Sequence, residues 1–363
     1  MKLLIISTVN RLSAYAEFVD ALDSLGVNAL LVHDLKCCFL SDSKPFDIIP
    51  TPKLLKLVKQ FNPDFVMTDS PYYITHMVKL VNKPVLFHMG GAEQGRTAER
   101  YWDVAMYPNF FSRVYTLYQA KIISPCIRKA DLILPNCRWL EEQVNQFLPN
   151  YPTRVLYEGI DAKKWVPNLN KAFDLKHPAV VGVFQYVIYP KVSGLMRFIK
   201  VIKQMPDVNF YFAGNGPYMG LIKRNCPSNM FLMGGISRSE VPGFLESGDV
   251  FVHPSGLDAL PSSVKEASLL ERPIVASSVG GIPEIVKNNQ TGYLCDIQDA
   301  DRWINKIRYM LENQDAARSF GKNAREFVVK KFDWKKIAEN FLRDFKACRD
   351  EVWPSIYRQK KES

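Results

Sequence analysis

Short apolar runs rich in β-branched residues alternate with helix-length segments along this chain, and this alternation restricts the fold more than any other feature. In the first half, helices expected at Ala14–Leu25 and Pro52–Phe61 separate the strands. The strands expected there are Leu3–Ser7, Ala29–Val32, Phe65–Thr68, Pro84–His88 and Leu132–Pro135. Strands joined through helices pair in parallel with right-handed crossovers. The first half therefore predicts a doubly wound α/β domain.

A second alternation of the same kind begins after Lys176. Its expected strands are Ala179–Phe184, Asn209–Ala213, Asn229–Met233, Val250–His253, Ile274–Ala276 and Tyr293–Cys295. Its expected helices are Gly194–Lys203, Tyr218–Asn225, Arg238–Glu246, Ser263–Leu270 and Ile282–Lys287. A chain of 363 residues is too long for one ordinary core. We therefore expect Rossmann-like domains at residues 1–165 and 166–332, followed by a C-terminal segment, 333–363, that is mainly one long helix over Phe332–Asp350.

Charge and cysteine usage narrow the class of protein. The net charge is +10, and most of the surplus falls in residues 302–363. This surplus indicates either a solvated helix face or a weak attraction to an anionic membrane or a phosphorylated acceptor. Nucleic-acid binding would favour a basic stripe with interleaved aromatic residues, which is not visible. Seven cysteines without a Cys-x-x-Cys pair favour a reducing compartment, hence the cytoplasm, and no apolar run approaches the roughly 20 residues that span a bilayer.

An aromatic-rich segment, Ala98–Lys129, is expected to be helical and to lie between two strands of the first domain. Core packing explains such an aromatic stripe at helical spacing. An acceptor-binding surface is the alternative, and the sequence leaves both open.

The segment from Val250 to Leu294 carries the predicted chemistry. A strand is followed by a turn that contains Asp258, then by a helix that Ser262 or Ser263 is expected to cap. The unpaired N–H groups of a helix N-terminus, together with the helix dipole, bind phosphate. Glu266 falls about one turn inside this helix, where it can accept hydrogen bonds from a ribose diol, and Asp258 can meet the hydroxyls of a sugar. A later turn, Gly280-Gly281, allows close approach of the backbone and opens another helix.

These motifs resemble a known family. Asp258-x7-Glu266, followed by Arg-Pro-Ile-Val-Ala-Ser and then Gly-Gly-Ile-Pro-Glu, is similar to the donor-site signature of retaining glycosyltransferase family 4, which has the GT-B fold. The family usually has Glu at the first acidic position, where this chain has Asp258. Further segments resemble the family in the same order, among them Glu158-Gly-Ile-Asp161 as an interdomain linker and Phe332-Asp-Trp334 at the start of a helix that returns to the first domain.

The resemblance implies a set of site residues. The donor would be bound by Glu266 and by the following residues: Gly216, Leu260, Ser262, Ser263, Gly280 and Gly281. Asp258 would contact the donor sugar, Lys191 would stabilise the departing diphosphate, and His88 would reach the sugar from the first domain. His253 also ends a strand, where either a packed role or a place in the site is open.

Two departures from the family pattern are visible. Gly182 is followed by Val183, where the family usually has an Arg that holds the diphosphate. The loop Thr8–Ala14 lacks the Gly-Gly turn that usually lies against the donor. Either change could weaken donor affinity or mark a specialised enzyme.

The resemblance implies a transferase that moves a sugar from UDP- or GDP-sugar to an acceptor hydroxyl with retention, with neither metal nor cofactor. A lipid-linked or other glycan acceptor and a peripheral position at the inner face of the membrane fit this expectation. Asp299-Ala-Asp301 mimics a metal motif of the other glycosyltransferase fold, but a helix cap explains it better. The alternatives are a sugar-nucleotide epimerase of the GT-B fold and a non-catalytic nucleotide-sugar-binding homologue; a nicotinamide dehydrogenase is disfavoured because Gly214-x-Gly216-x-x-x-Gly220 has one residue too many.

Overall fold

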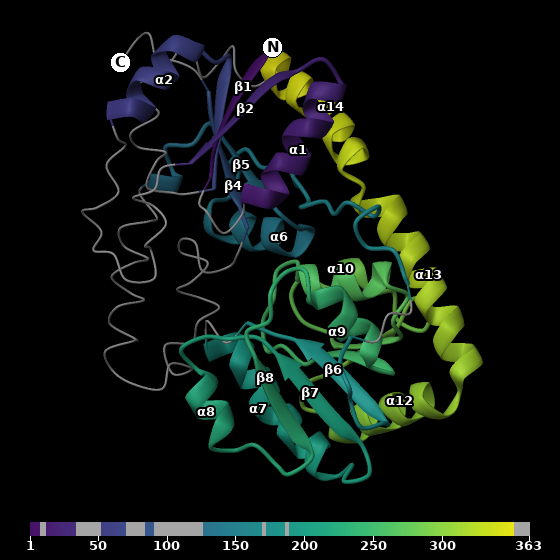
Figure 1. Cartoon of the computed structure of the whole chain (residues 1–363). Coiled ribbons are helices and arrows are strands. Elements are labelled where there is room, and N and C mark those ends of the chain that lie inside the picture. The colour runs from purple at the N-terminus through teal and green to yellow at the C-terminus, as the bar shows by residue number, and fades with distance from the viewer. Residues whose placement is uncertain are drawn as a thin grey trace.

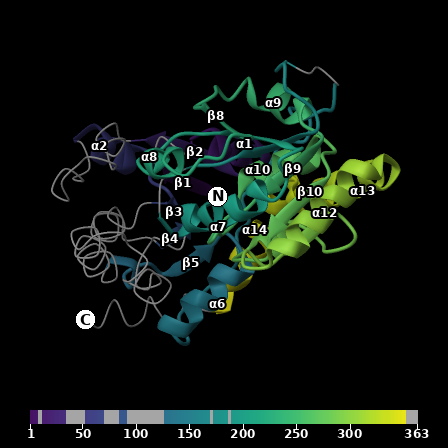
Figure 2. The same ribbon diagram turned by 90° about the horizontal axis from the view of Figure 1, so that it is seen from below.

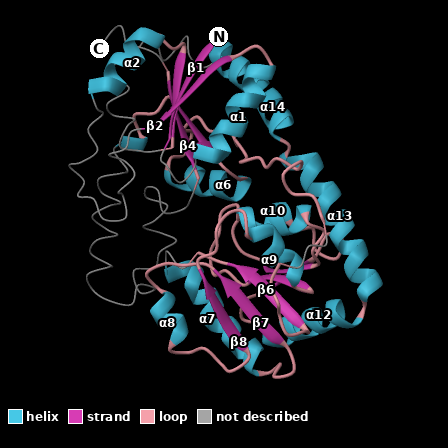
Figure 3. Ribbon diagram, in the orientation of Figure 1, coloured by secondary structure: helices cyan, strands magenta, loops and turns pink. Residues whose placement is uncertain are grey.

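The structure is a computed structural model that describes residues 1–7, 12–33, 52–69, 84–90, 126–168, 172–185 and 189–351. The described residues form two parallel sheets, each flanked by helices (Figures 1 and 3). This arrangement confirms the expected pair of Rossmann-like domains. Most of the aromatic-rich segment Ala98–Lys129 and residues 8–11 of the Thr8–Ala14 loop lie outside the described residues.

The first domain is built on a five-stranded sheet of order β2-β1-β3-β4-β5, in which all pairs are parallel. Its strands are β1 (Lys2–Ser7), β2 (Asn28–His33), β3 (Phe65–Thr68), β4 (Val85–Met89) and β5 (Leu132–Pro135). Its described helices are α1 (Leu12–Ser24), α2 (Pro52–Phe61) and α6 (Arg138–Phe147). The strands match the predicted ones to within one residue at each end, because buried apolar runs between turn residues are a strong signal.

Helix α6 has no counterpart among the predicted helices. Its N-cap is Cys137, whose Sγ accepts a hydrogen bond from the Leu140 N–H at 3.4 Å. Cysteine is not one of the usual N-cap residues, so the sequence gives no start signal at this position.

The second domain is built on a six-stranded parallel sheet of order β11-β10-β9-β6-β7-β8. Its strands are β6 (Ala179–Val183), β7 (Asn209–Ala213), β8 (Met230–Gly234), β9 (Val250–His253), β10 (Ile274–Ser277) and β11 (Tyr293–Cys295). Its helices are α7 (Tyr189–Lys203), α8 (Met219–Lys223), α9 (Val241–Ser247), α10 (Ser262–Leu269), α11 (Ile282–Ile285), α12 (Ala300–Glu312) and α13 (Gln314–Phe332). Seen from below, α12 and α13 run side by side along one flank of this domain (Figure 2).

Helix α7 starts five residues before the predicted start at Gly194. A Cβ on Gly194 would overlap the backbone of Ser255 and Gly256, so this glycine lets the helix pack against the loop that follows β9. The predicted start at Gly194 was therefore wrong: this glycine lies inside the helix at a close packing contact.

Helix α14 (Trp334–Glu351) returns to the first domain (Figure 1). It begins after Phe332, which ends α13, because Asp333 is extended between the two helices. The Phe345 ring stacks on Phe65 with centroids 3.9 Å apart, and Trp334 packs against Phe18. The expected return of the C-terminal helix is therefore confirmed, with a start two residues later than predicted.

The domains meet in a packed junction. One continuous cluster of buried apolar side chains includes Val85 and Cys137 of the first domain and Phe251 and Ala259 of the second. The chain crosses this junction twice, and the two crossings are joined where the Ile160 N–H donates to the Phe332 carbonyl at 2.9 Å. None of the helices in the described ranges combines the length and the apolar character that crossing a bilayer requires.

Candidate active site

A buried cluster forms where β9 ends and α7 begins. Asp258, 7% exposed in the loop between β9 and α10, lies 3.0 Å from Lys191 Nζ and accepts a hydrogen bond from His253 Nε2 at 3.2 Å. Burial alone would raise the pKa of Asp258, but the Lys191 charge and the His253 hydrogen bond outweigh it and hold the pKa below its ordinary value. The carboxylate therefore stays ionised in a nearly dry position.

Two predicted site residues, Asp258 and Lys191, are thus brought together by the fold. Lys191 lies in the first turn of α7, and its carbonyl accepts from the Gly256 N–H at 3.2 Å, which ties the helix to the loop that carries Asp258. His253, left open by the sequence, belongs to the same cluster. Its Nδ1 is buried and has no partner among the described residues.

The Gly280-Gly281 turn packs directly on the Asp258 loop. The Gly281 N–H donates to the Asp258 carbonyl at 3.0 Å, and a Cβ on Gly280 or Gly281 would overlap the carbonyl of Asp258 or Ala259. Gly280 has a φ of +57°, which also favours glycine. The diglycine therefore allows two loops of the protein to meet, whereas the sequence explained it by close approach to a ligand.

Helix α10 begins beside this turn without a side-chain cap. Its N-cap residue is Pro261, and neither Ser262 nor Ser263 forms the cap that we expected. That expectation was wrong because the backbone takes its helical conformation one residue earlier, which places both serines inside the first turn. Among the described residues no side chain caps this helix start, which leaves its first-turn N–H groups suited to an anion. Leu260, just before the helix, is buried, whereas Ser262 is exposed.

Glu266 lies inside α10 and is 2% exposed. Its Oε1 accepts from Arg238 Nη1 at 2.5 Å, and the Arg238 guanidinium lies 4.8 Å from the centroid of the Trp165 ring. Burial raises the pKa of Glu266, and the Arg238 charge opposes this rise. Arg238 was missed by the sequence reading because it comes from a distant loop, and no local spacing links it to Glu266.

Gly216 follows the end of β7 in a partly exposed turn, where its N–H donates to Asn215 Oδ1 at 2.8 Å. The carboxyl ends of parallel strands β7 and β9 lie at one edge of the sheet, so this turn and the Asp258 loop share that edge. At Gly182, in β6, a Cβ would press on the Phe212 ring.

His88 lies in β4 of the first domain and is 1% exposed. Its Nε2–H donates to the Leu156 carbonyl at 3.0 Å, and its Nδ1 is close to the hydroxyl of Tyr15. These contacts all come from the first domain. The proposed contact between His88 and a donor sugar stays a prediction.

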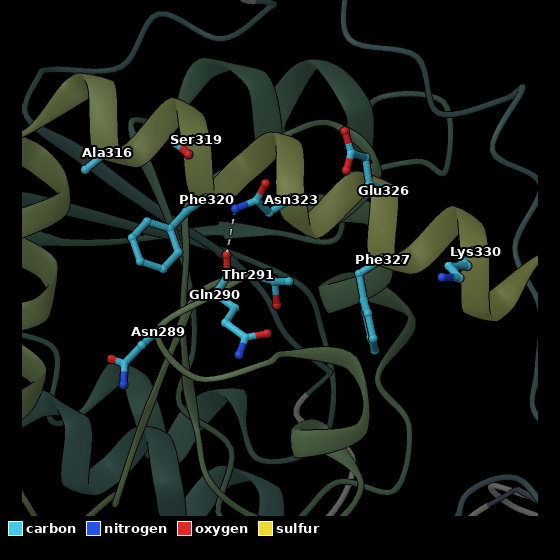
Figure 4. Close-up of a pocket in the computed structure, with 10 residues that line it drawn as sticks. All are labelled: Asn289, Gln290, Thr291, Ala316, Ser319, Phe320, Asn323, Glu326, Phe327 and Lys330. Carbon is cyan, nitrogen blue, oxygen red and sulfur yellow. Dashed lines mark hydrogen bonds between the residues drawn. The ribbon is translucent and has the colours of Figure 1, made fainter.

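A cavity of about 650 Å³ lies elsewhere, between α13 and the loop after α11 (Figure 4). Its lining includes Asn323, whose amide donates to the Gln290 carbonyl at 3.2 Å, and Phe320. It contains none of the predicted site residues. At Asp299, by contrast, the expected cap is confirmed: Oδ1 accepts from the Arg302 N–H at 3.0 Å at the start of α12.

Comparison with known proteins gives a family match and a match of fold. Residues 171–327 match the family described as glycosyl transferases, group 1. The fold is similar to that of sucrose-phosphate synthase from Thermosynechococcus elongatus, with a TM-score of 0.72 and 18% identity over 96% of this chain and all of that one. The family match over the second domain and the shared fold together indicate a GT-B glycosyltransferase of the family 4 kind.

The chain is also similar to two curated glycosyltransferases and to a further solved structure. The chain is 25% identical to the sulfoquinovosyl transferase SQD2 of Arabidopsis thaliana over 80% of its own length and 58% of that protein. It is 29% identical to an Escherichia coli UDP-Gal:α-D-GlcNAc-diphosphoundecaprenol α-1,3-galactosyltransferase over 49% of its length and 50% of that protein. The chain thus spans about half to three-fifths of these curated relatives. Anabaena HepE in complex with UDP-glucose shares the fold, with a TM-score of 0.71 and 17% identity over 96% of this chain and 100% of HepE.

Proposed function

We propose that this GT-B glycosyltransferase moves a sugar from a nucleoside-diphosphate sugar to an acceptor hydroxyl with retention of the anomeric configuration. The observation that carries the proposal is the Asp258 cluster, in which a buried, ionised carboxylate lies between Lys191 and His253 beside the uncapped first turn of α10. A carboxylate can accept hydrogen bonds from sugar hydroxyls, and the adjoining cation and helix N-terminus attract a diphosphate.

The reaction breaks the bond between the anomeric carbon and the diphosphate oxygen, and forms a bond from that carbon to the acceptor oxygen. The electron pair of the broken bond stays on the diphosphate, so negative charge develops on the leaving group, and a phosphate oxygen of that group takes the proton that the acceptor hydroxyl loses. Lys191 and the first turn of α10 would stabilise that charge without a metal ion or a cofactor. Asp258 would hold the sugar hydroxyls, and Glu266 the ribose.

The known relatives limit the candidate donor nucleotides and acceptors for this chain. SQD2 is a sulfoquinovosyl transferase, the E. coli relative is a galactosyltransferase that uses UDP-Gal and a GlcNAc-diphosphoundecaprenol, and HepE forms a complex with UDP-glucose. We infer a UDP- or GDP-sugar donor and a lipid-linked or other glycan acceptor, in the cytoplasm with peripheral contact at the inner face of the membrane. Transfer assays with and without EDTA test the metal independence, and co-sedimentation with anionic vesicles tests the membrane contact.

Donor binding is the first property to test. Thermal unfolding of the wild type is measured with a panel of UDP- and GDP-sugars, and a ligand at a hundred times its Kd adds about 2.7 kcal/mol of stability. We expect one donor class to raise the melting temperature, and Glu266→Gln to remove most of that rise, because the amide lacks the charge and one of the two acceptor oxygens that a carboxylate offers to the two hydroxyls of a ribose.

The matched control is Glu312→Gln, which changes a glutamate at the end of α12 away from the site. It should leave the donor-induced rise intact. A full rise in Glu266→Gln would contradict the role of Glu266, and no rise with any donor in the wild type would contradict the proposed function.

A further inference from the structure

Glu284 lies in α11, directly after the Gly280-Gly281 turn, and its carboxylate joins the two domains. Oε1 accepts from the Trp139 N–H at 3.0 Å, in the first turn of α6 of the first domain. Oε2 accepts from the Tyr157 hydroxyl at 2.7 Å, in the segment that leads from one domain to the other. The side chain is 15% exposed. One carboxylate of the second domain is therefore held by two groups outside that domain.

The contact with α6 has a clear physical basis. The first N–H groups of a helix lack partners within the helix and carry partial positive charge. The residue at the N-cap of α6, Cys137, offers only a thiol, which is a weak acceptor. Glu284 supplies from the other domain the charged acceptor that this helix end lacks.

The second chain crossing reaches the same carboxylate. Lys331, near the end of α13, has its Nζ 4.0 Å from Glu284 Oε2 and donates to the Glu284 carbonyl at 2.9 Å. The same ammonium lies 4.7 Å from the Tyr157 ring centroid. Burial lowers the pKa of Lys331 to about 8, although the negative charge of Glu284 acts to raise it. Both segments that connect the domains, at Tyr157 and at Lys331, thus converge on Glu284.

We propose that Glu284 is the positioning residue that locks the two domains in register and so places the Asp258 loop against the first domain. The link to Asp258 is short, because the Gly281 N–H that donates to the Asp258 carbonyl belongs to the same turn that opens α11. The consequence for transfer rests on the proposed function; the lock itself does not.

A native cysteine reports on this junction. Cys137 is fully buried, and its Sγ lies 3.0 Å from the position that a Cβ on Gly281 would take, so the second domain covers it. Cys295 is equally buried, but inside the second-domain core. The rate at which iodoacetamide modifies each thiol, followed by residue-resolved mass spectrometry, separates opening of the junction from unfolding of the second domain.

We expect Glu284→Ala to raise the modification rate of Cys137 by about tenfold or more, since charged hydrogen bonds that hold the junction closed are lost, and to leave Cys295 unchanged. Burial raises the pKa of the Cys137 thiol and the negative charge of Glu284 adds to that rise, so removal of this charge alone could speed modification. Glu284→Gln resolves this ambiguity, because it removes the charge and keeps an acceptor oxygen for the Trp139 N–H. Its Cys137 rate should stay close to that of the wild type.

A second variant tests the same junction. Tyr157→Phe removes one hydrogen bond to Glu284 and should raise the modification rate of Cys137 by a smaller factor than Glu284→Ala does. It replaces Glu284→Ala as the test if that variant does not fold. Its matched control is Tyr151→Phe, which loses a bond to Ala130 within the first domain and should leave the rate unchanged. The proposal is overturned if Cys137 reacts at the wild-type rate in Glu284→Ala, if both thiols speed up together, or if Glu284→Gln is as fast as Glu284→Ala. None of these readouts needs donor or turnover, so failure here is distinct from failure of the proposed function.

Discussion

Asp258 depends on its partners for its charge, because its own surroundings are nearly dry. An ionised carboxylate removed from water is costly unless a cation and hydrogen bonds replace the lost solvation. Lys191 and His253 supply both, and the net result is a lowered pKa. A group whose folded pKa is lowered contributes stability above its ordinary pKa of 3.8, and this stability is lost as the pH falls through the folded value.

Removal of the cation should therefore have a pH signature. We expect Lys191→Met to lower the free energy of unfolding at pH 7 by about 3 kcal/mol, because an uncompensated charge is left buried. Burial without the Lys191 charge raises the pKa of Asp258, so in the variant the carboxyl is protonated at a higher pH than in the wild type, and the deficit should shrink as the pH falls towards 3.8 and below. Urea unfolding from pH 7 to pH 3 measures this difference.

Lys200→Met is the matched control for that series, since it removes an exposed lysine from the same helix, α7. Its deficit should be small at every pH. A pH-independent deficit in Lys191→Met would show that the ion pair does not set the protonation of Asp258.

At this scale, spacing along the chain predicted some partners and not others. Asp258 was predicted from its motif and Lys191 from the resemblance to the family, and the fold unites them. Arg238 reaches Glu266 from 28 residues away, and Trp139 reaches Glu284 from 145 away. Such pairs depend on how distant loops and domains pack, which no local pattern encodes.

A close contact at one glycine positions the returning helix α14 against the segment that links the domains. Gly159, in the first crossing between the domains, faces the ring of Trp334, the first residue of α14, and a Cβ there would overlap the ring. The Trp334 indole N–H donates to Glu17 Oε2 at 2.9 Å, which fixes the ring against α1. The crossing segment and the returning helix therefore share one tight contact.

This contact predicts the effect of a single methyl group. Gly159→Ala should lower the free energy of unfolding by about 1 to 3 kcal/mol, because the Trp334 ring or the backbone must shift to make room for the new methyl group. Gly220→Ala is the control: Gly220 lies in α8 with nothing within 4 Å of a new Cβ, and the substitution should be neutral or should stabilise by up to about 1 kcal/mol. Chemical unfolding measures the free energy of unfolding of both variants. An equal change in the two would contradict the close contact between Gly159 and Trp334.

Element types were predicted well from periodicity, and their ends less well. Buried strands such as β9 matched at both ends, since apolar runs between turn residues are a direct signal of burial. Helix α7 was predicted too short because Gly194, the expected first residue, lies inside the helix, where its lack of a side chain allows close packing. Helix α6 was missed because its start is stabilised by Glu284 of the other domain.

The molecule has two domains, and helix α14, near the end of the chain, packs against the core of the first domain. Helix α14 buries Trp334, Phe341 and Phe345 against the first-domain core, next to Phe18 and Phe65. The second-domain core around Phe198 and Trp303 forms a separate cluster without α14. A defect in α14 should consequently loosen the first domain while the second keeps its structure.

Hydrogen exchange can locate that loosening. Phe345→Ala should cost about 3 to 5 kcal/mol, because it removes a buried ring that stacks on Phe65. We expect amide protection to fall in peptides of β1 and β3, with peptides of β6 and β7 little changed. Phe198→Ala, which removes a fully buried ring from the second domain, should give the reverse pattern. If either substitution lowered protection equally in both sheets, the junction around Glu284 would couple the domains into a single unfolding unit, and α14 would then stabilise the molecule as a whole and not the first domain alone.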